Sequence, residues 1–344
     1  MSVLPVRPGR AGLLQDHLLV QASADAANIT ALLANRSGSG IVLSGPQALM
    51  AGLRLTKTTP GLPLLCDRRR YAGKSRASGR APFDPRWLDG QRELNVPHVL
   101  SDSGYIGCGD VRALVAVLDQ AVAAGQDVTA VLPVHASWLR GDLSTFISEV
   151  SAHSVPIALV LEHRADPLSV LETVRGLVTL IRQVPAVGLL CSDVSALGAL
   201  AFGASWAAVG VRTSLRHLYP ADGGFGSPDG MPSALVDPAL ALIKVGKIAA
   251  AWAATPDDPV WACFCSVCHG RTLDWLLSAT AEQANQHTFE LLLDRRDGLM
   301  SLPGPLREQS WRAKCASAAF QYEALALVGV AWDVPRFLRN WQAV

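Results

Sequence analysis

The feature that most constrains the fold is a regular alternation of short apolar runs with longer amphipathic stretches. The apolar runs are rich in Val, Ile and Leu, as expected for strands that are buried on both faces of a parallel sheet. Their number favours an α/β fold closed into a (β/α)8 TIM barrel. A doubly wound open sheet is the alternative, because strands are easily miscounted from sequence. The predicted strands are 17–23, 40–45, 63–67, 98–104, 128–135, 156–163, 187–193 and 206–214.

The stretches between these runs have the apolar spacing of helices that cover a sheet. After the last run the alternation ends, and residues 219–235 are rich in Gly, Pro and Asp, which predicts an exposed loop. A helix is predicted at 238–254 and a final helical region at 307–332. The predicted barrel helices are 31–36, 85–95, 110–125, 142–153, 167–184 and 194–203.

Length and composition describe a soluble globular protein with a large core. The chain has 344 residues, of which 50% are hydrophobic and 17% charged. One large domain with an insertion and a pair of domains both fit this length. We divide the chain into a barrel at 1–218, a segment of loop, helix and zinc-binding residues at 219–310, and a C-terminal helix at 311–344 that packs back on the barrel.

The chain has no apolar run long enough to cross a membrane, and the N-terminal MSVLPVRPGR lacks the apolar core of a signal peptide. We therefore expect a cytoplasmic protein without a membrane partner, in which free thiols stay reduced. The formal net charge of +1 argues against a protein that coats nucleic acid indiscriminately. A local basic patch remains compatible with that charge.

A cysteine cluster marks the C-terminal third. Cys263, Cys265 and Cys268 form C-x-C-x-x-C, and His287 follows in an apolar helical run. Three thiolates and one imidazole complete the tetrahedral shell of Zn²⁺, so we predict a structural zinc site without an open position for substrate. Ordinary buried thiols are the alternative, but the other four cysteines are scattered singly. His269 is a rival fourth ligand, disfavoured because adjacent residues seldom both reach one ion.

Polar residues end most of the predicted strands. In a (β/α)8 barrel the active site lies at the carboxyl ends of the strands. Several carboxylates at one mouth suit acid/base or nucleophilic chemistry on a small polar ring. For any single residue, capping of the next helix is the alternative. The residues at these ends are Asp67, Asp102, Ser103, His135, Glu162, His163, Asp193 and 212–214.

Two basic segments follow predicted strand ends. Residues 68–80 contain six basic residues and no acidic one, which predicts a mobile cationic loop suited to phosphates. Arg212, Ser214 and Arg216 lie in the second segment, at a place where barrels often bind phosphate. A solvated loop is the alternative for the first segment, and a helix start with a salt bridge for the second.

The chain resembles the tRNA-guanine transglycosylase family, whose fold is a (β/α)8 barrel with a zinc subdomain inserted after the last strand. The specific part of the likeness is the C-x-C-x-x-C cluster followed by a histidine on an apolar helix, in the same place along the chain. Residues 100–104, L-S-D-S-G, also resemble the family's L-T-D-S-G-G-F-Q strand end. The resemblance implies that Asp102 acts as acid/base and contacts the base. It also implies that Ser103 and Gly104 line the pocket.

The chain also departs from the family pattern. The family's nucleophile segment, F-D-C-V-x-P-T-R, corresponds to residues 207–214, which contain no carboxylate. The base-reading Asp of the family and the glutamine of its V-Q-G-G are missing, and D-S-G falls on predicted strand four where the family has it on strand three. If base exchange is retained, Asp193 is the expected nucleophile. Glu162 and Asp67 are the next candidates.

The sequence thus favours a transglycosylase-like enzyme that exchanges a guanine-type base for a 7-deazaguanine in nucleic acid, with tRNA and DNA equally admissible. One carboxylate would attack C1′, a second would move the proton, and the target nucleotide must leave its stack. A non-catalytic partner subunit is the second hypothesis, which predicts that Asp102, Asp193 and Glu162 do not converge. The third is a barrel enzyme acting on a free nucleoside, with the basic loop folded away from an enclosed mouth. The resemblance also implies a homodimer.

Overall fold

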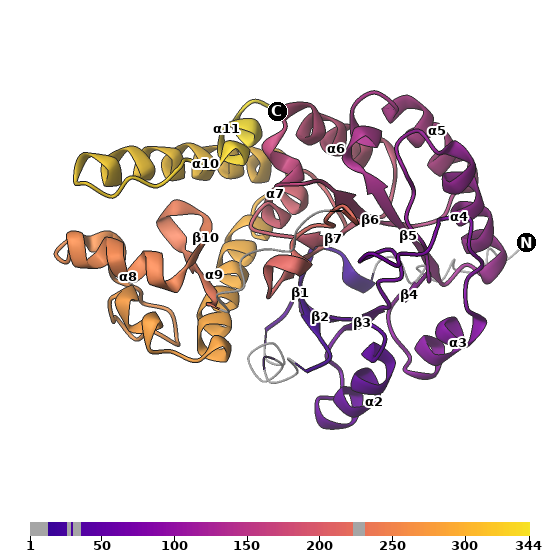
Figure 1. Ribbon diagram of the computed structural model, residues 1–344, viewed down its shortest axis with the longest axis horizontal. Helices are drawn as coiled ribbons and strands as arrows, with labels where there is room; N and C mark the ends of the chain where they lie inside the picture. The colour runs from indigo at the N-terminus through magenta and orange to yellow at the C-terminus, as the bar shows by residue number, and fades with distance from the viewer. Residues whose placement is uncertain (1–12, 26–28, 30–35, 223–230) are drawn as a thin grey trace, which may run out of the picture.

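The computed structural model describes residues 13–25, 29, 36–222 and 231–344. Its centre is a nearly closed sheet of eight parallel strands in the order β3-β2-β1-β8-β7-β6-β5-β4 (Figure 1). Strands β3 and β4, at the two ends of this order, are in contact. This order runs around a barrel, so the predicted fold class is confirmed and the doubly wound alternative is excluded. The strands are β1 (His17–Ser23), β2 (Ser39–Ser44), β3 (Leu64–Asp67), β4 (Val99–Leu100), β5 (Val128–His135), β6 (Ile157–Glu162), β7 (Val187–Ser192) and β8 (Trp206–Gly210).

The parallel register separates the side chains into an inner and an outer layer. Val20 of β1 pairs with Ile41 on one side and Val209 on the other, and all three are buried in the outer layer against the helices. Inside the barrel Trp206 fills the centre beside Gly188, where a Cβ atom would lie 2.3 Å from the indole ring. The surrounding helices are α2 (Ala48–Thr58), α3 (Pro85–Glu93), α4 (Val111–Ala124), α5 (Leu143–His153), α6 (Leu171–Gln183) and α7 (Ala196–Ala201).

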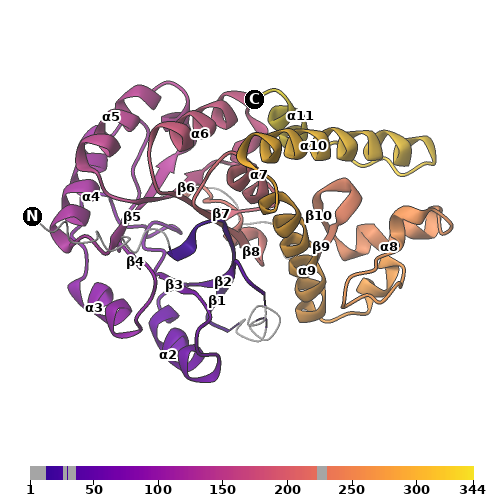
Figure 2. The same ribbon diagram turned by 180° about the vertical axis from the view of Figure 1, so that it is seen from behind.

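An inserted subdomain follows β8. It contains the antiparallel pair β9 (Ser233–Val236) and β10 (Ala241–Lys244), the helix α8 (Val245–Ala254) and the long helix α9 (Ala281–Met300). Within the subdomain, helix α9 lies nearest to the barrel, where it contacts α7 and β1 (Figures 1 and 2). Arg36, just before β2, forms ion pairs with three carboxylates of α9. One helix therefore both completes the barrel wall and belongs to the subdomain.

Two C-terminal helices pack on the outside of the barrel. Helix α10 (Gly304–Leu327) contacts α7 and α11 (Arg336–Gln342), and α11 also contacts α6. The indole rings of Trp311 and Trp341 meet edge to face over Gly198 of α7, where a Cβ atom would lie 2.6 Å from each indole. Within the described ranges, no helix is long and apolar enough to cross a membrane.

The structure differs from the sequence predictions at several element boundaries. Residues 241–244 form a strand, not part of a helix, because they pair with 233–236, of which 233–235 were predicted to be loop. The fourth strand is reduced to Val99–Leu100, and the eighth ends at Gly210. Helix α2 was not predicted, and the predicted helix 31–36 lies, except for its last residue, outside the described residues.

Candidate functional site

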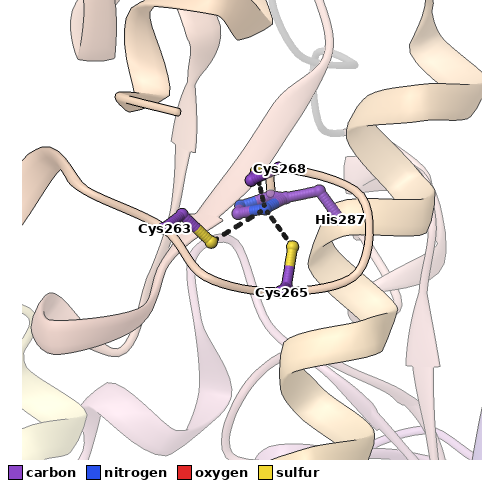
Figure 3. Close-up of side chains that lie close together, drawn as sticks. All are labelled: Cys263, Cys265, Cys268 and His287. Atoms are coloured by element: carbon purple, nitrogen blue, oxygen red, sulfur yellow. Dashed lines mark hydrogen bonds between the residues drawn. The ribbon is translucent and has the colours of Figure 1, made fainter. Parts of the chain in front are cut away.

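The first candidate site is a buried cluster of Cys263, Cys265, Cys268 and His287 (Figure 3). The four ligand atoms all lie within 4.8 Å of one another. The three sulfur atoms lie 3.7, 3.6 and 3.2 Å from His287 Nδ1, in chain order of the cysteines. Such a convergence of thiols and an imidazole can hold a metal ion, as the sequence spacing predicted.

A short turn and a capped helix position these ligands. The Cys268 amide donates to the Cys265 carbonyl at 3.1 Å, and the Gly270 amide donates to the Cys263 carbonyl at 2.9 Å. His269 and Gly270 adopt positive φ values of 54° and 84°, which fold the chain back after the last cysteine. His269 itself is exposed and lies outside the cluster, so the rival fourth ligand is excluded.

Two neighbouring groups orient the cluster. His287 Nε2 lies 2.9 Å from the Leu235 carbonyl of β9, which fixes the proton on Nε2 and leaves Nδ1 free to bind a metal. The Trp275 indole donates to Cys268 Sγ at 3.3 Å. Helix α9 begins with a capping box between Thr280 and Gln283. The capping box fixes the start of the helix, and His287 lies in its second turn.

The second candidate site is the carboxyl end of the barrel, where the arginine-rich loop 68–80 lies on Asp102. Arg70 Nη1 donates to Asp102 Oδ2 at 2.7 Å and Arg68 Nη1 donates to the same oxygen at 3.1 Å. Arg68 also pairs with Asp84. The basic loop is therefore folded onto the mouth and paired with its acids, which differs from the mobile cationic loop predicted from sequence.

The D-S-G segment after β4 also anchors this loop. The Tyr105 amide donates to the Ala77 carbonyl and the Gly79 amide donates to the Tyr105 carbonyl, both at 2.8 Å. A Cβ atom at Gly104 would lie 2.1 Å from the Ser78 carbonyl oxygen, so only glycine permits this approach. Ser103 is buried and its hydroxyl is hydrogen-bonded to the Ser101 hydroxyl at 2.7 Å. Ser103 and Gly104 thus contact protein groups, and the pocket-lining role that the resemblance implies for them stays a prediction.

Glu162, at the end of β6, is held by a third arginine of the loop. Arg76 Nη1 donates to Glu162 Oε1 at 3.0 Å, and the Arg76 guanidinium lies 3.5 Å from the centre of the Tyr105 ring. Burial raises the pKa of Glu162, and the Arg76 charge opposes that rise.

Asp67 lies in a buried network that sequence reasoning did not identify. Its Oδ2 accepts hydrogen bonds from Tyr71 Oη at 2.6 Å and from Gln21 Nε2 at 3.3 Å. Gln21 also contacts Cys191 Sγ at 3.3 Å, so residues of β1, β3 and β7 meet at one point. Burial raises the pKa of Asp67. The only sequence signal was the tyrosine within the arginine run, because Gln21 and Cys191 sit in apolar strands.

Asp193, the predicted nucleophile, contacts other residues than Asp67, Asp102 and Glu162 do. Its Oδ1 accepts a hydrogen bond from the Ser195 amide at 2.9 Å, and Arg216 interacts with its charge. Burial raises the pKa of Asp193. Asp166 was missed in the sequence because it follows β6 at the start of a short turn. Burial, and then the charge of Asp193, raise the pKa of Asp166 to about 8.

Asp102 and Asp193 therefore have separate sets of partners within the described part of the chain. The remaining residues of the second basic segment are also paired with protein groups. Arg212 is exposed and forms an ion pair with Asp25 at 3.2 Å, and the Ser214 carbonyl accepts a hydrogen bond from Arg69. These pairings match the salt-bridge alternative for this segment.

Four buried polar atoms at the mouth have no hydrogen-bond partner among the described residues. Asp102 Oδ1 and Glu162 Oε2 are hydrogen-bond acceptors and Arg69 Nε is a donor. His217 Nε2 can be either. Buried polar atoms are nearly always hydrogen-bonded in folded proteins, and leaving one unpaired costs about 1–3 kcal/mol. These four atoms are therefore candidates for contact with a polar ligand that offers both donors and acceptors.

Comparisons with known proteins add no family or relative. No family model matches this chain, and no curated protein matches it.

Proposed function

We propose that the chain is a transglycosylase-like enzyme that exchanges a guanine-type base for a 7-deazaguanine in nucleic acid, either tRNA or DNA. The observation that carries this proposal is the set of unpartnered buried polar atoms at the barrel mouth. A guanine edge offers N–H donors for Asp102 Oδ1 and Glu162 Oε2 and a carbonyl acceptor for Arg69 Nε. The D-S-G position of Asp102 and the barrel with its inserted Cys3His subdomain support the same family.

Asp193 is the proposed nucleophile. In the first step an Asp193 oxygen forms a bond to C1′ while the bond from C1′ to the base nitrogen breaks, and the departing base takes a proton from Asp102. In the second step Asp102 accepts the proton of the incoming base, whose nitrogen attacks C1′ and releases the Asp193 carboxylate. Arg216 interacts with the Asp193 charge and favours the ionised form that attack requires.

The Cys3His cluster fits a structural zinc ion. Zn–S bonds of about 2.3 Å and a Zn–N bond of about 2.0 Å in a tetrahedron separate sulfur from nitrogen by about 3.5 Å. The observed separations from His287 Nδ1 are 3.7, 3.6 and 3.2 Å. A zinc ion held by Cys263, Cys265, Cys268 and His287 would join the turn to α9 and would have no position open to substrate.

A non-catalytic nucleic-acid-binding partner is the second candidate. It is favoured by the separate partners of Asp102 and Asp193 and by the arginines that cover the mouth acids. The expected homodimer also remains a proposal from the family resemblance.

The test is a label-incorporation assay. The zinc-loaded protein is incubated with tRNA, duplex DNA, single-stranded DNA or free guanosine, together with labelled guanine or 7-deazaguanine bases. We expect incorporation into one polymer and a loss of about 100-fold or more in Asp102→Asn and Asp193→Asn. Asp110→Asn, a carboxylate paired with Arg80 on the surface, is the matched control. Tight polymer binding without any incorporation would support the partner subunit, and incorporation only with guanosine would support the free-nucleoside enzyme.

A further inference from the structure

The barrel mouth has two charged layers. The lower layer consists of the carboxylates of Asp102 and Glu162, whose side chains are 0% and 4% exposed. The upper layer consists of the guanidinium groups of Arg68, Arg70 and Arg76, whose side chains are 32%, 25% and 22% exposed. Solvent therefore reaches the arginines while the acids beneath them are covered. The two acids that the proposed function assigns to the base, Asp102 and Glu162, are therefore covered by one loop.

Tyr71 anchors the loop 68–80 in the barrel core through Asp67, and the contacts of the loop with the acids and with Tyr105 at the mouth are exchangeable. Its arginines pair with acids, and its backbone bonds to Tyr105 through the Ala77 carbonyl and the Gly79 amide. Each covered acid keeps one oxygen without a partner, Asp102 Oδ1 and Glu162 Oε2. A ligand that entered beneath the loop would therefore find acceptors already in place.

We infer that the loop 68–80 is a phosphodiester-binding lid, whose arginines exchange the acids Asp102 and Glu162 for phosphates of the nucleic acid and so uncover the mouth. This inference rests on the proposed function, because it names how a nucleic-acid substrate reaches that site. Guanidinium groups bind phosphate oxygens through paired, charge-assisted hydrogen bonds.

Exchange of partners makes the opening thermodynamically accessible. Separating a buried arginine from its acid without replacement is costly, because it leaves an uncompensated charge. When phosphates pair with Arg68, Arg70 and Arg76, each guanidinium keeps a counter-charge, and the N–H groups of a base give each carboxylate hydrogen-bond donors in place of the arginines. A ligand shifts a conformational equilibrium only by its differential affinity for the two states, and the phosphates supply that difference. A free base has no anion to offer, so it leaves the lid closed.

Amide hydrogen exchange tests the lid directly. The full-length zinc-loaded protein is mixed with a single-stranded 20-mer of DNA, a matching RNA, or free guanine, and exchange is followed at the Gly79 and Tyr105 amides, which bond across the lid contact. We expect either oligonucleotide to accelerate exchange at both amides by about tenfold or more, and guanine to leave it unchanged. Failure of both oligonucleotides to bind, or binding that leaves exchange unchanged or slower, overturns the inference.

A glycine pair supplies a ligand-free test. In Gly104→Ala the new Cβ meets the Ser78 carbonyl at 2.1 Å and should lift the loop, whereas in Gly107→Ala the nearest atom is a Tyr105 ring carbon at 4.0 Å. We expect trypsin to cleave after Lys74 and Arg76 about tenfold faster in Gly104→Ala and at the wild-type rate in Gly107→Ala. Arg76→Gln removes the contact with Glu162 but also removes one trypsin site, so it is scored at Lys74 alone, where it should give a smaller increase in the same direction. Equal cleavage in all four proteins contradicts a movable lid.

These tests separate the inference from the proposed function. If oligonucleotides open the lid but no base is exchanged, the lid is supported and the proposed enzyme activity is rejected. If bases are exchanged while the lid stays closed, the enzyme activity is supported and the lid is rejected.

Discussion

The Cys3His cluster and the barrel mouth both contain buried polar groups, but these groups are paired in different ways. In the cluster, four ligand atoms converge on one point, and the surrounding groups, the Leu235 carbonyl and the Trp275 indole, orient them. At the mouth, acids pair separately with arginines, and four buried polar atoms have no partner among the described residues. One cation would complete the cluster. The mouth atoms would need a ligand with several polar groups, so the two sites place different demands on what they bind.

Removal of the metal should have the largest effect. In Cys268→Ser, or after chelation, the turn and α9 lose their common ligand, and α9 also forms part of the barrel wall. We expect the free energy of unfolding to fall by about 5 kcal/mol or more, since structural zinc sites contribute about 10–16 kcal/mol in small domains. Bound zinc is measured by elemental analysis and stability by thermal circular dichroism.

The control for this experiment is His269→Ala, which removes an exposed histidine next to the last cysteine. It should keep one zinc ion per chain and wild-type stability. A Cys268→Ser protein that retains zinc and melts like the wild type contradicts a structural site.

Asp102→Ala should have the next largest effect. The substitution leaves Arg68 and Arg70 without their common buried carboxylate, and we expect a loss of about 2–3 kcal/mol in urea unfolding. Asp102→Asn keeps the shape and should lose less. If Asp102→Ala is as stable as wild type, the arginine layer does not depend on this acid and the contrast with the metal cluster fails.

Asp166→Asn should change the pH dependence of stability. Burial and the Asp193 charge raise the pKa of Asp166 to about 8, so this carboxyl favours folding when it carries a proton. Its contribution is complete below about pH 4 and is lost as the pH rises through about 8. Asparagine keeps the hydrogen bond to the Leu168 amide without titrating. We therefore expect the variant to be more stable than wild type by about 2 kcal/mol at about pH 9 and equal at about pH 4.

Asp258→Asn is the matched control for the pH experiment, because Asp258 caps the Val260 amide in the same way at 2.9 Å. Any general effect of replacing a capping carboxylate by an amide appears in this variant too, and is subtracted from the effect of Asp166→Asn. A pH-independent difference for Asp166→Asn would show that the pKa of Asp166 is not raised in the folded protein.

Arg80→Ala should have the smallest effect. Arg80 pairs with Asp110 at 2.7 Å, but its side chain is 54% exposed, so water and salt screen the pair. We expect a loss below about 1 kcal/mol in urea unfolding, reduced further by added salt. A loss comparable to that of Asp102→Ala would mean that the outer part of the loop is as strongly held as the part over the mouth.

The sequence predicted the local parts of this molecule well. Alternating apolar runs sufficed for the barrel, since each strand shows its burial in its own residues, although helix α2 was missed. The metal cluster was predictable because three of its ligands lie within six residues and the fourth on a helix with an evident cap. The helix predicted through 241–244 was wrong, because antiparallel pairing with β9 overrides the helical composition there.

The sequence by itself determined the barrel, the Cys3His ligand set and the presence of acids and arginines at the strand ends. Only the tertiary structure decided that Arg70 lies on Asp102, Arg76 on Glu162 and Tyr71 on Asp67. The same is true of the Asp166–Asp193 pair, whose members come from different loops. The physical reason is that ligand spacing in a tight turn is fixed by local backbone geometry. The partner of a long charged side chain depends instead on strand register and loop path, which no local pattern encodes.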